Sequence, residues 1–126
     1  MDIRNLHDVP AFTTKDGSEI RELLAYRNSL IKLQSLAAAR VAPGLTTTLH
    51  YHVKSEEIYY ITSGRGRVRV GHEYREVQPG DAVAIPPGAL HQITGLGSED
   101  LTFLCCCTPP YEHEDTVLME ETKLAR

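Results

Sequence analysis

The segment that most constrains this chain runs from Gly44 to Gly64 and reads GLTTTLHYHVKSEEIYYITSG. It carries His50 and His52, and on a β-strand two side chains at this spacing share one face, so both can bind a single metal ion. Glu57 follows at a spacing of the wrong parity for one continuous strand. The polar run 53–56 is therefore predicted to be a turn, after which Glu57 returns on the next strand to face the histidines.

A second segment supplies a further candidate ligand. Residues 80–95 read GDAVAIPPGALHQITG, with a corner at Pro86-Pro87-Gly88. Proline restricts φ and glycine accepts φ values that other residues avoid, so this corner is predicted to be rigid. His91 follows the corner directly, and we interpret the corner as a device that aims His91 at the other two histidines.

The two segments together resemble the motifs of the cupin family. The first family motif is a glycine, five residues, His-x-His, three or four residues, Glu, six residues and a glycine, and it is met here by Gly44, His50, His52, Glu57 and Gly64. The second motif is met by Gly80, Pro86, Gly88 and His91. Its last position departs from the pattern, since Gly95 stands in place of an asparagine that is not a metal ligand in the family. The resemblance implies an all-β fold, a jelly-roll barrel (double-stranded β-helix) of two antiparallel sheets.

The rest of the pattern agrees with a β-rich domain. Short runs rich in Val, Ile, Thr or Tyr, separated by turn residues, are typical of a sandwich or barrel. The predicted strands are 45–51, 57–62, 66–70, 74–77, 82–85, 91–94 and 101–107. Residues 18–27 and 35–41 fit either a helix or a strand, and the resemblance favours strands.

Length and charge limit the organisation and the partners. The 126 residues are predicted to form one cupin domain, with an N-terminal arm over 1–17 and a C-terminal tail over 108–126. The net charge is −4 without a basic run, which argues against nucleic acid as a partner. No apolar run reaches membrane-spanning length and the start does not resemble a signal peptide, so we expect no membrane association and a cytoplasmic location.

Three smaller features lead to further expectations. Cys105, Cys106 and Cys107 are adjacent and odd in number, so we interpret them as buried apolar side chains rather than a disulfide framework. The valines of the strand 66–70 are predicted to face inward and its arginines outward. Ile58 and Tyr60 would then lie on an outer apolar face, and we expect a homodimer partner or the N-terminal arm to cover them. The acidic run 112–115 is predicted to be a solvated loop.

The predicted site binds one divalent transition metal, Fe, Mn, Ni, Co, Cu or Zn, through His50, His52, Glu57 and His91. Four protein ligands leave two positions open on an octahedral ion. Candidate catalytic side chains are Tyr59, which shares the face of Glu57, and Arg40, which precedes the first motif. Other expected neighbours are Tyr51 and Gln92 for the pocket, and Thr46, Thr48, Gln92 and Thr94 as hydrogen-bond partners of the imidazoles.

These ligands allow three readings of the function. The first is a metalloenzyme acting on a small sugar-like, carboxylate or carbonyl compound, by Lewis-acid isomerisation as in mannose-6-phosphate isomerase-like cupins or by dioxygenation. The second is a non-catalytic module that binds a small molecule as a sensor. The third is a barrel with a vestigial site, which the intact set of ligands argues against.

Overall fold

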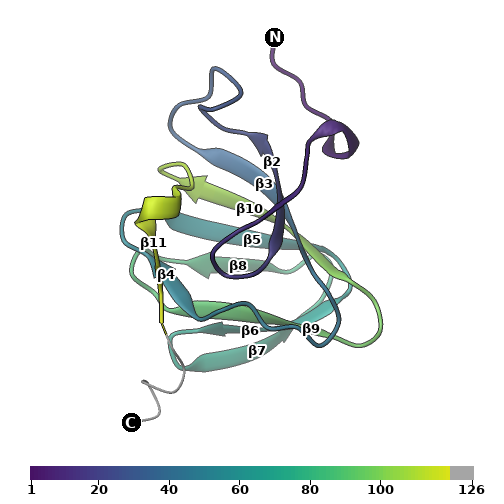
Figure 1. Cartoon of the computed structure of the whole chain (residues 1–126). Coiled ribbons are helices and arrows are strands. Elements are labelled where there is room, and N and C mark those ends of the chain that lie inside the picture. The colour runs from purple at the N-terminus through teal and green to yellow at the C-terminus, as the bar shows by residue number, and fades with distance from the viewer. Residues whose placement is uncertain (120–126) are drawn as a thin grey trace.

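The computed structural model describes residues 1–119, and β-strands dominate it (Figure 1). Among these residues the helical elements are two 3-10 turns, η1 (Leu6–Asp8) and η2 (His113–Asp115). The strands are β1 (Phe12–Thr13), β2 (Glu19–Leu24), β3 (Ser35–Val41), β4 (His50–His52), β5 (Glu56–Ser63), β6 (Arg65–Val70), β7 (Glu73–Val77), β8 (Ala82–Ile85), β9 (His91–Leu96), β10 (Leu101–Thr108) and β11 (Thr116–Leu118). Within 1–119, no helix has the length and apolar character of a membrane span.

The strands form two sheets whose named pairings are all antiparallel, which confirms the predicted all-β jelly roll. One sheet has the order β1-β2-β3-β10-β5-β8 and the other β11-β4-β9-β6-β7. Figure 1 shows the first sheet stacked above the second. Both sheets contribute inward side chains to one core, including Ile61 on β5, Ile93 on β9 and Leu101 on β10, all fully buried.

The core follows from strict alternation along the strands. On β5, β9 and β10 buried and more exposed residues alternate, as expected of strands with one face toward the core. The two ambiguous segments, 18–27 and 35–41, contain strands β2 and β3 and no helix. Cys105 and Cys107 face inward with Cys106 between them less buried, and all three thiols are free, as predicted.

Four predictions of local structure are wrong. The strand expected over 45–51 is limited to β4, because Thr47 and Thr48 donate their backbone N–H groups to Ile93 and Asp16 instead of to a ladder. The strand expected over 91–94 continues to Leu96, so Gly95 lies inside β9, where a Cβ would come within 2.7 Å of the Ala42 carbonyl oxygen. Close packing of two backbones therefore explains this glycine.

The other two wrong predictions concern the arginine-rich strand and the C-terminal tail. Arg69 was predicted to be exposed to solvent but is only 8% exposed. Its Nε donates to the Gly71 carbonyl, and its guanidinium lies 5.3 Å from the centre of the Tyr74 ring. The acidic run has no buried residue, as predicted for a solvated segment, but it is not an irregular loop, because it forms η2 and leads into β11, which pairs with β4. Positions 120–126 of the predicted tail lie outside the described residues.

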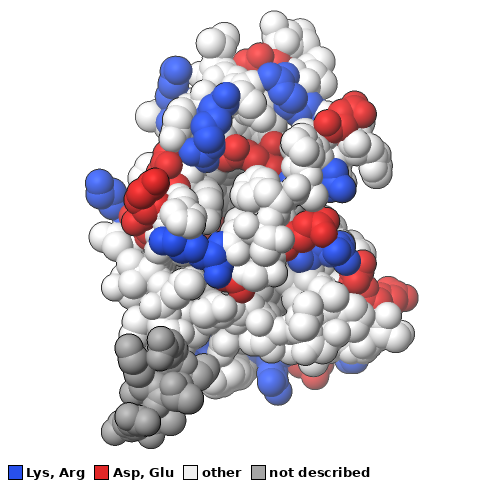
Figure 2. Space-filling view, in the orientation of Figure 1, with Lys and Arg blue, Asp and Glu red and all other residues white. Residues whose placement is uncertain are grey.

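The charged residues show no single-sign patch on the face seen in Figure 2, where Lys and Arg alternate with Asp and Glu. Ile58 and Tyr60 point outward from β5 and are 50% and 46% exposed. The N-terminal arm therefore leaves them accessible, and the homodimer stays a prediction.

Candidate metal centre

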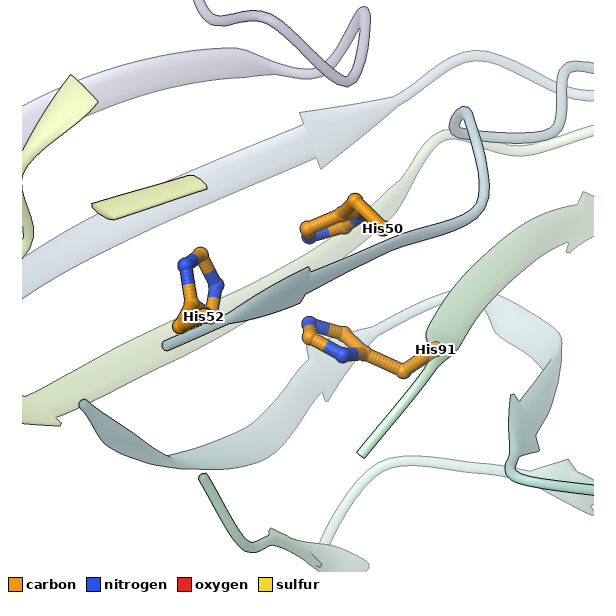
Figure 3. Close-up of side chains that lie close together, drawn as sticks. All are labelled: His50, His52 and His91. Carbon is orange, nitrogen blue, oxygen red and sulfur yellow. The ribbon is translucent and has the colours of Figure 1, made fainter. Parts of the chain in front are cut away.

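The three histidines come from two neighbouring strands of the smaller sheet, and their side chains lie close together (Figure 3). His50 and His52 both project inward from β4, and His50 lies directly opposite His91 on β9. The rings of His50 and His91 have centroids 4.1 Å apart, and one nitrogen from each of the three rings lies within 4.8 Å of the others. All three side chains are at most 4% exposed.

Hydrogen bonds determine which ring nitrogen carries the proton. His50 Nδ1 lies 2.7 Å from the Thr48 carbonyl and His91 Nδ1 lies 2.9 Å from the Ala89 carbonyl, and a carbonyl can only accept. His52 Nδ1 lies 3.1 Å from Thr116 Oγ1, whose own proton goes to the Glu112 carbonyl. Each Nδ1 is therefore the donor, so the neutral form of each ring has its lone pair on Nε2.

Glu57 completes the cluster from β5. Its Oε1 lies 3.2 Å from His52 Nε2 and 3.3 Å from His91 Nε2, while its Oε2 accepts a hydrogen bond from the Cys107 thiol at 3.3 Å. His91 Nε2 is buried without a hydrogen-bond partner among the described residues. Lone pairs thus face a carboxylate oxygen in a buried place, which is unfavourable unless a cation lies between them.

The electrostatics agree with a cation in this gap. Burial opposes ionisation of Glu57, but the close approach of the His52 and His91 rings outweighs it and lowers the pKa of Glu57 to about 2. That stabilisation requires positive charge on the Nε2 side, which either a proton or a metal ion can supply. Burial, reinforced by His91, lowers the pKa of His50 to about 4, so His50 is neutral at pH 7 as metal binding requires.

The donor set is chemically suited to a divalent transition metal. Three imidazole nitrogens and one carboxylate oxygen fit the preferences of Fe, Mn, Ni, Co, Cu and Zn. Each imidazole is also oriented by a partner on Nδ1, which is the usual arrangement of histidine ligands. The structure therefore brings together all four predicted ligand residues, while Glu56, the neighbouring carboxylate, is exposed.

The other predicted site residues divide into two groups. Tyr59 does line the cavity next to the cluster, with its ring 6.0 Å from that of His91. Arg40 does not, because it lies on the exposed side of β3 and forms ion pairs with Glu19 and Asp100. Gln92 and Tyr51 occupy the alternate positions of their strands and are not among the cavity's lining residues. Of the four proposed imidazole partners, the structure uses only Thr48, through its backbone carbonyl.

Sequence reasoning missed three residues that contact the cluster: Asp16, Cys107 and Thr116. Asp16 lies in the turn before β2 and Thr116 begins β11, so both come from the chain ends rather than from the two motifs. The alternation of Thr116-Val117-Leu118 after the acidic run was a weak strand signal. Cys107 was expected to be a buried apolar side chain, and its contact with Glu57 could not be identified without the pairing of β10 with β5.

A small cavity of about 40 Å³ opens above the cluster. Its apolar wall includes Ile20, Ala37, Ala39 and Phe103, and its polar groups include Asp16 and Tyr111. Among the residues that the structure describes, no lysine or arginine lines it. Burial raises the pKa of Tyr59 well above its ordinary value and also raises that of Tyr111, so both phenols stay protonated at neutral pH.

Comparisons with known proteins agree with this architecture. A family model described as "Cupin domain" matches residues 38–107. An uncharacterised protein from Methanocaldococcus jannaschii is 48% identical over 112 residues, which cover 89% of this chain and 90% of that protein. Among solved structures, KdgF from Halomonas sp. has a TM-score of 0.78 at 18% identity, covering 90% of this chain and 98% of that chain. Pac13 from Streptomyces, described as a nucleoside dehydratase, has a TM-score of 0.77 at 15% identity, covering 98% and 97%. At these identities the two structures share the fold.

Proposed function

The chain belongs to the cupin domain family, and on this premise we propose that it is a metal-dependent enzyme acting on a small polar molecule. One observation carries the proposal: three buried imidazoles lie together, the Nε2 atoms of His52 and His91 are 3.2 and 3.3 Å from Glu57 Oε1, and His91 Nε2 has no hydrogen-bond partner in the described chain. Packing of the core does not explain this arrangement. Burying these polar atoms costs free energy, and a bound cation would offset that cost.

The metal would be held by His50, His52, Glu57 and His91. When bound, it supplies Lewis-acid chemistry that polarises a carbonyl, or, if it is Fe(II), a centre for dioxygen chemistry. Residues of the chain itself orient the site. Thr116 fixes the His52 ring and the Cys107 thiol donates to the outer oxygen of Glu57. Burial raises the pKa of Cys107, so it serves as a hydrogen-bond donor and not as a thiolate ligand.

The cavity favours a small substrate without strong negative charge. Its volume of about 40 Å³ corresponds to a few water molecules, at about 10–15 Å³ each on this measure, so a larger ligand requires side chains to move. Asp16, Glu22 and Glu57 line it, without a lysine or arginine among the described residues. A phosphate group would find no side-chain cation there. We therefore propose a neutral sugar-like or carbonyl compound rather than a phosphorylated sugar, with Tyr59 as a protonated donor beside it.

Metal analysis of purified variants tests the ligand assignment. His91→Ala and Glu57→Ala are expected to lose the metal while keeping the β-sheet signal in circular dichroism, since each removes a donor from the cluster. Glu56→Ala is the matched control, because this carboxylate is adjacent in sequence but exposed, and it should keep the metal. Equal metal content in all three variants would refute the assignment.

Identifying the metal in the wild-type protein separates the two versions of the chemistry. Iron favours dioxygenation, and zinc favours Lewis-acid isomerisation. Raised thermal stability with a candidate molecule but no product would instead indicate the second reading, a binding module. We also propose that Ile58 and Tyr60 belong to a homodimer interface, which light scattering of the wild type and of Tyr60→Glu can test.

A further inference from the structure

A second carboxylate, that of Asp16, reaches the metal centre from the N-terminal arm. Asp16 lies in the turn between β1 and β2, and its Oδ2 is 3.6 Å from His50 Nε2. Its side chain is 12% exposed and lines the same cavity as His50, His52 and Glu57. Asp16 therefore approaches His50, whereas Glu57 approaches His52 and His91, and Asp16 belongs to neither sequence motif.

The contacts of Asp16 hold this carboxylate in one orientation. Its Oδ1 accepts from Ser18 N at 2.9 Å, from Ser18 Oγ at 2.7 Å and from Thr14 Oγ1 at 2.7 Å. The turn itself is tied down, because Thr48 N donates to the Asp16 carbonyl at 2.7 Å and Lys15 Nζ donates to the Thr116 carbonyl at 2.9 Å. One oxygen thus serves the turn, while the other is directed at His50.

A turn-forming role alone does not explain the position of Oδ2. His50 donates from Nδ1 to the Thr48 carbonyl, so its Nε2 offers a lone pair to Asp16 Oδ2, and two acceptors face each other. Two donor atoms that each lie about 2.1 Å from one ion are about 3.0 Å apart at a right angle and about 3.6 Å apart at 120°. The contacts of Glu57 with His52 and His91, at 3.2 and 3.3 Å, and that of Asp16 with His50 all fall in this range.

We propose that Asp16 is a fifth protein ligand of the metal, so that the donor set is three imidazoles and two carboxylates. This inference rests on the proposed metal site and extends it. Two carboxylates balance the charge of a divalent ion, which lowers the cost of burying that ion. Five protein ligands leave a single position on an octahedral ion for water or substrate, rather than two. The N-terminal arm, outside the matched region 38–107, then becomes part of the centre.

The test counts water molecules on bound Mn²⁺. In water enriched in ¹⁷O, each exchangeable water on Mn²⁺ broadens its electron paramagnetic resonance lines, and the broadening gives their number. The wild-type protein is expected to show one water and Asp16→Asn two, with Mn²⁺ affinity at least about tenfold weaker in the variant. Asparagine keeps an Oδ1 for Ser18 N, so the turn should survive, and thermal unfolding of the metal-free variant checks this.

Glu22→Gln is the matched control. Glu22 lines the same cavity, but its carboxylate forms an ion pair with Arg27, so the water count on Mn²⁺ should remain one. Two waters in the wild type, or the same count and affinity in wild type and Asp16→Asn, would overturn the role of Asp16 and leave the four-ligand site standing. If the wild-type protein binds no divalent transition metal, the proposed function fails as well, so the two failures are distinguishable.

Discussion

Replacing Thr116 by valine removes the hydroxyl that orients His52 while keeping the volume of the side chain. Thr116 is 3% exposed, and its Oγ1 accepts from His52 Nδ1 at 3.1 Å. In the variant this buried N–H has no acceptor and water has little access to it, which costs about 1–3 kcal/mol of stability. Loss of such an outer partner of a histidine ligand weakens metal binding about 10–100-fold, equivalent to about 1.4–2.8 kcal/mol.

The assay is a Mn²⁺ titration by calorimetry, with the wild type and three variants measured at the same pH. Thr116→Ser keeps the hydroxyl and should bind close to the wild type, whereas Thr116→Val should not. Thr46→Val is the control for loss of a threonine hydroxyl elsewhere, because Thr46 pairs with Thr94 on the surface. If Thr116→Val binds Mn²⁺ within about twofold of the wild type, the orientation of His52 does not depend on β11 and this reasoning is wrong.

Three further predictions concern stability. Because the folded pKa of His50 is about 4 against an ordinary 6.5, the folded metal-free protein binds fewer protons than the unfolded chain between these values. Its unfolding free energy should therefore fall by about 3 kcal/mol as the pH drops from 6.5 to 4, measured by urea titration, and His50→Gln should flatten this part of the profile. Gly64→Ala should unfold at a far lower urea concentration than Gly44→Ala. Both glycines have positive φ, but only at Gly64 would a Cβ come within 2.3 Å of a carbonyl oxygen, that of Asp100. Equal urea midpoints of the two variants would contradict this. Ile93→Ala should lose about 2–5 kcal/mol from the fully buried core, yet bind as much metal per folded molecule as the wild type in elemental analysis.

Much of the strand pattern could be predicted from local rules. The inward alternation on β5 and β10 follows from the period of two along a strand, and this parity placed Glu57 and Tyr59 on one face. The glycines at both ends of the first segment, Gly44 and Gly64, have positive φ, as turn residues often do. Arg40 was predicted to line the pocket, but it alternates with the buried residues Ala39 and Val41 and therefore points away from the core.

The sequence by itself determined the residue types at the centre and the faces from which they project, because spacing along a strand and the geometry of a proline-glycine corner are local properties. Only the tertiary structure decided which side chains support those residues. Thr116 lies 64 positions from His52, and Cys107 lies 50 positions from Glu57. Asp16 approaches His50 from the arm. Such contacts form when distant strands pair and the chain ends fold over the barrel. Their stability depends on the packing of the whole molecule. Local sequence patterns therefore do not predict them.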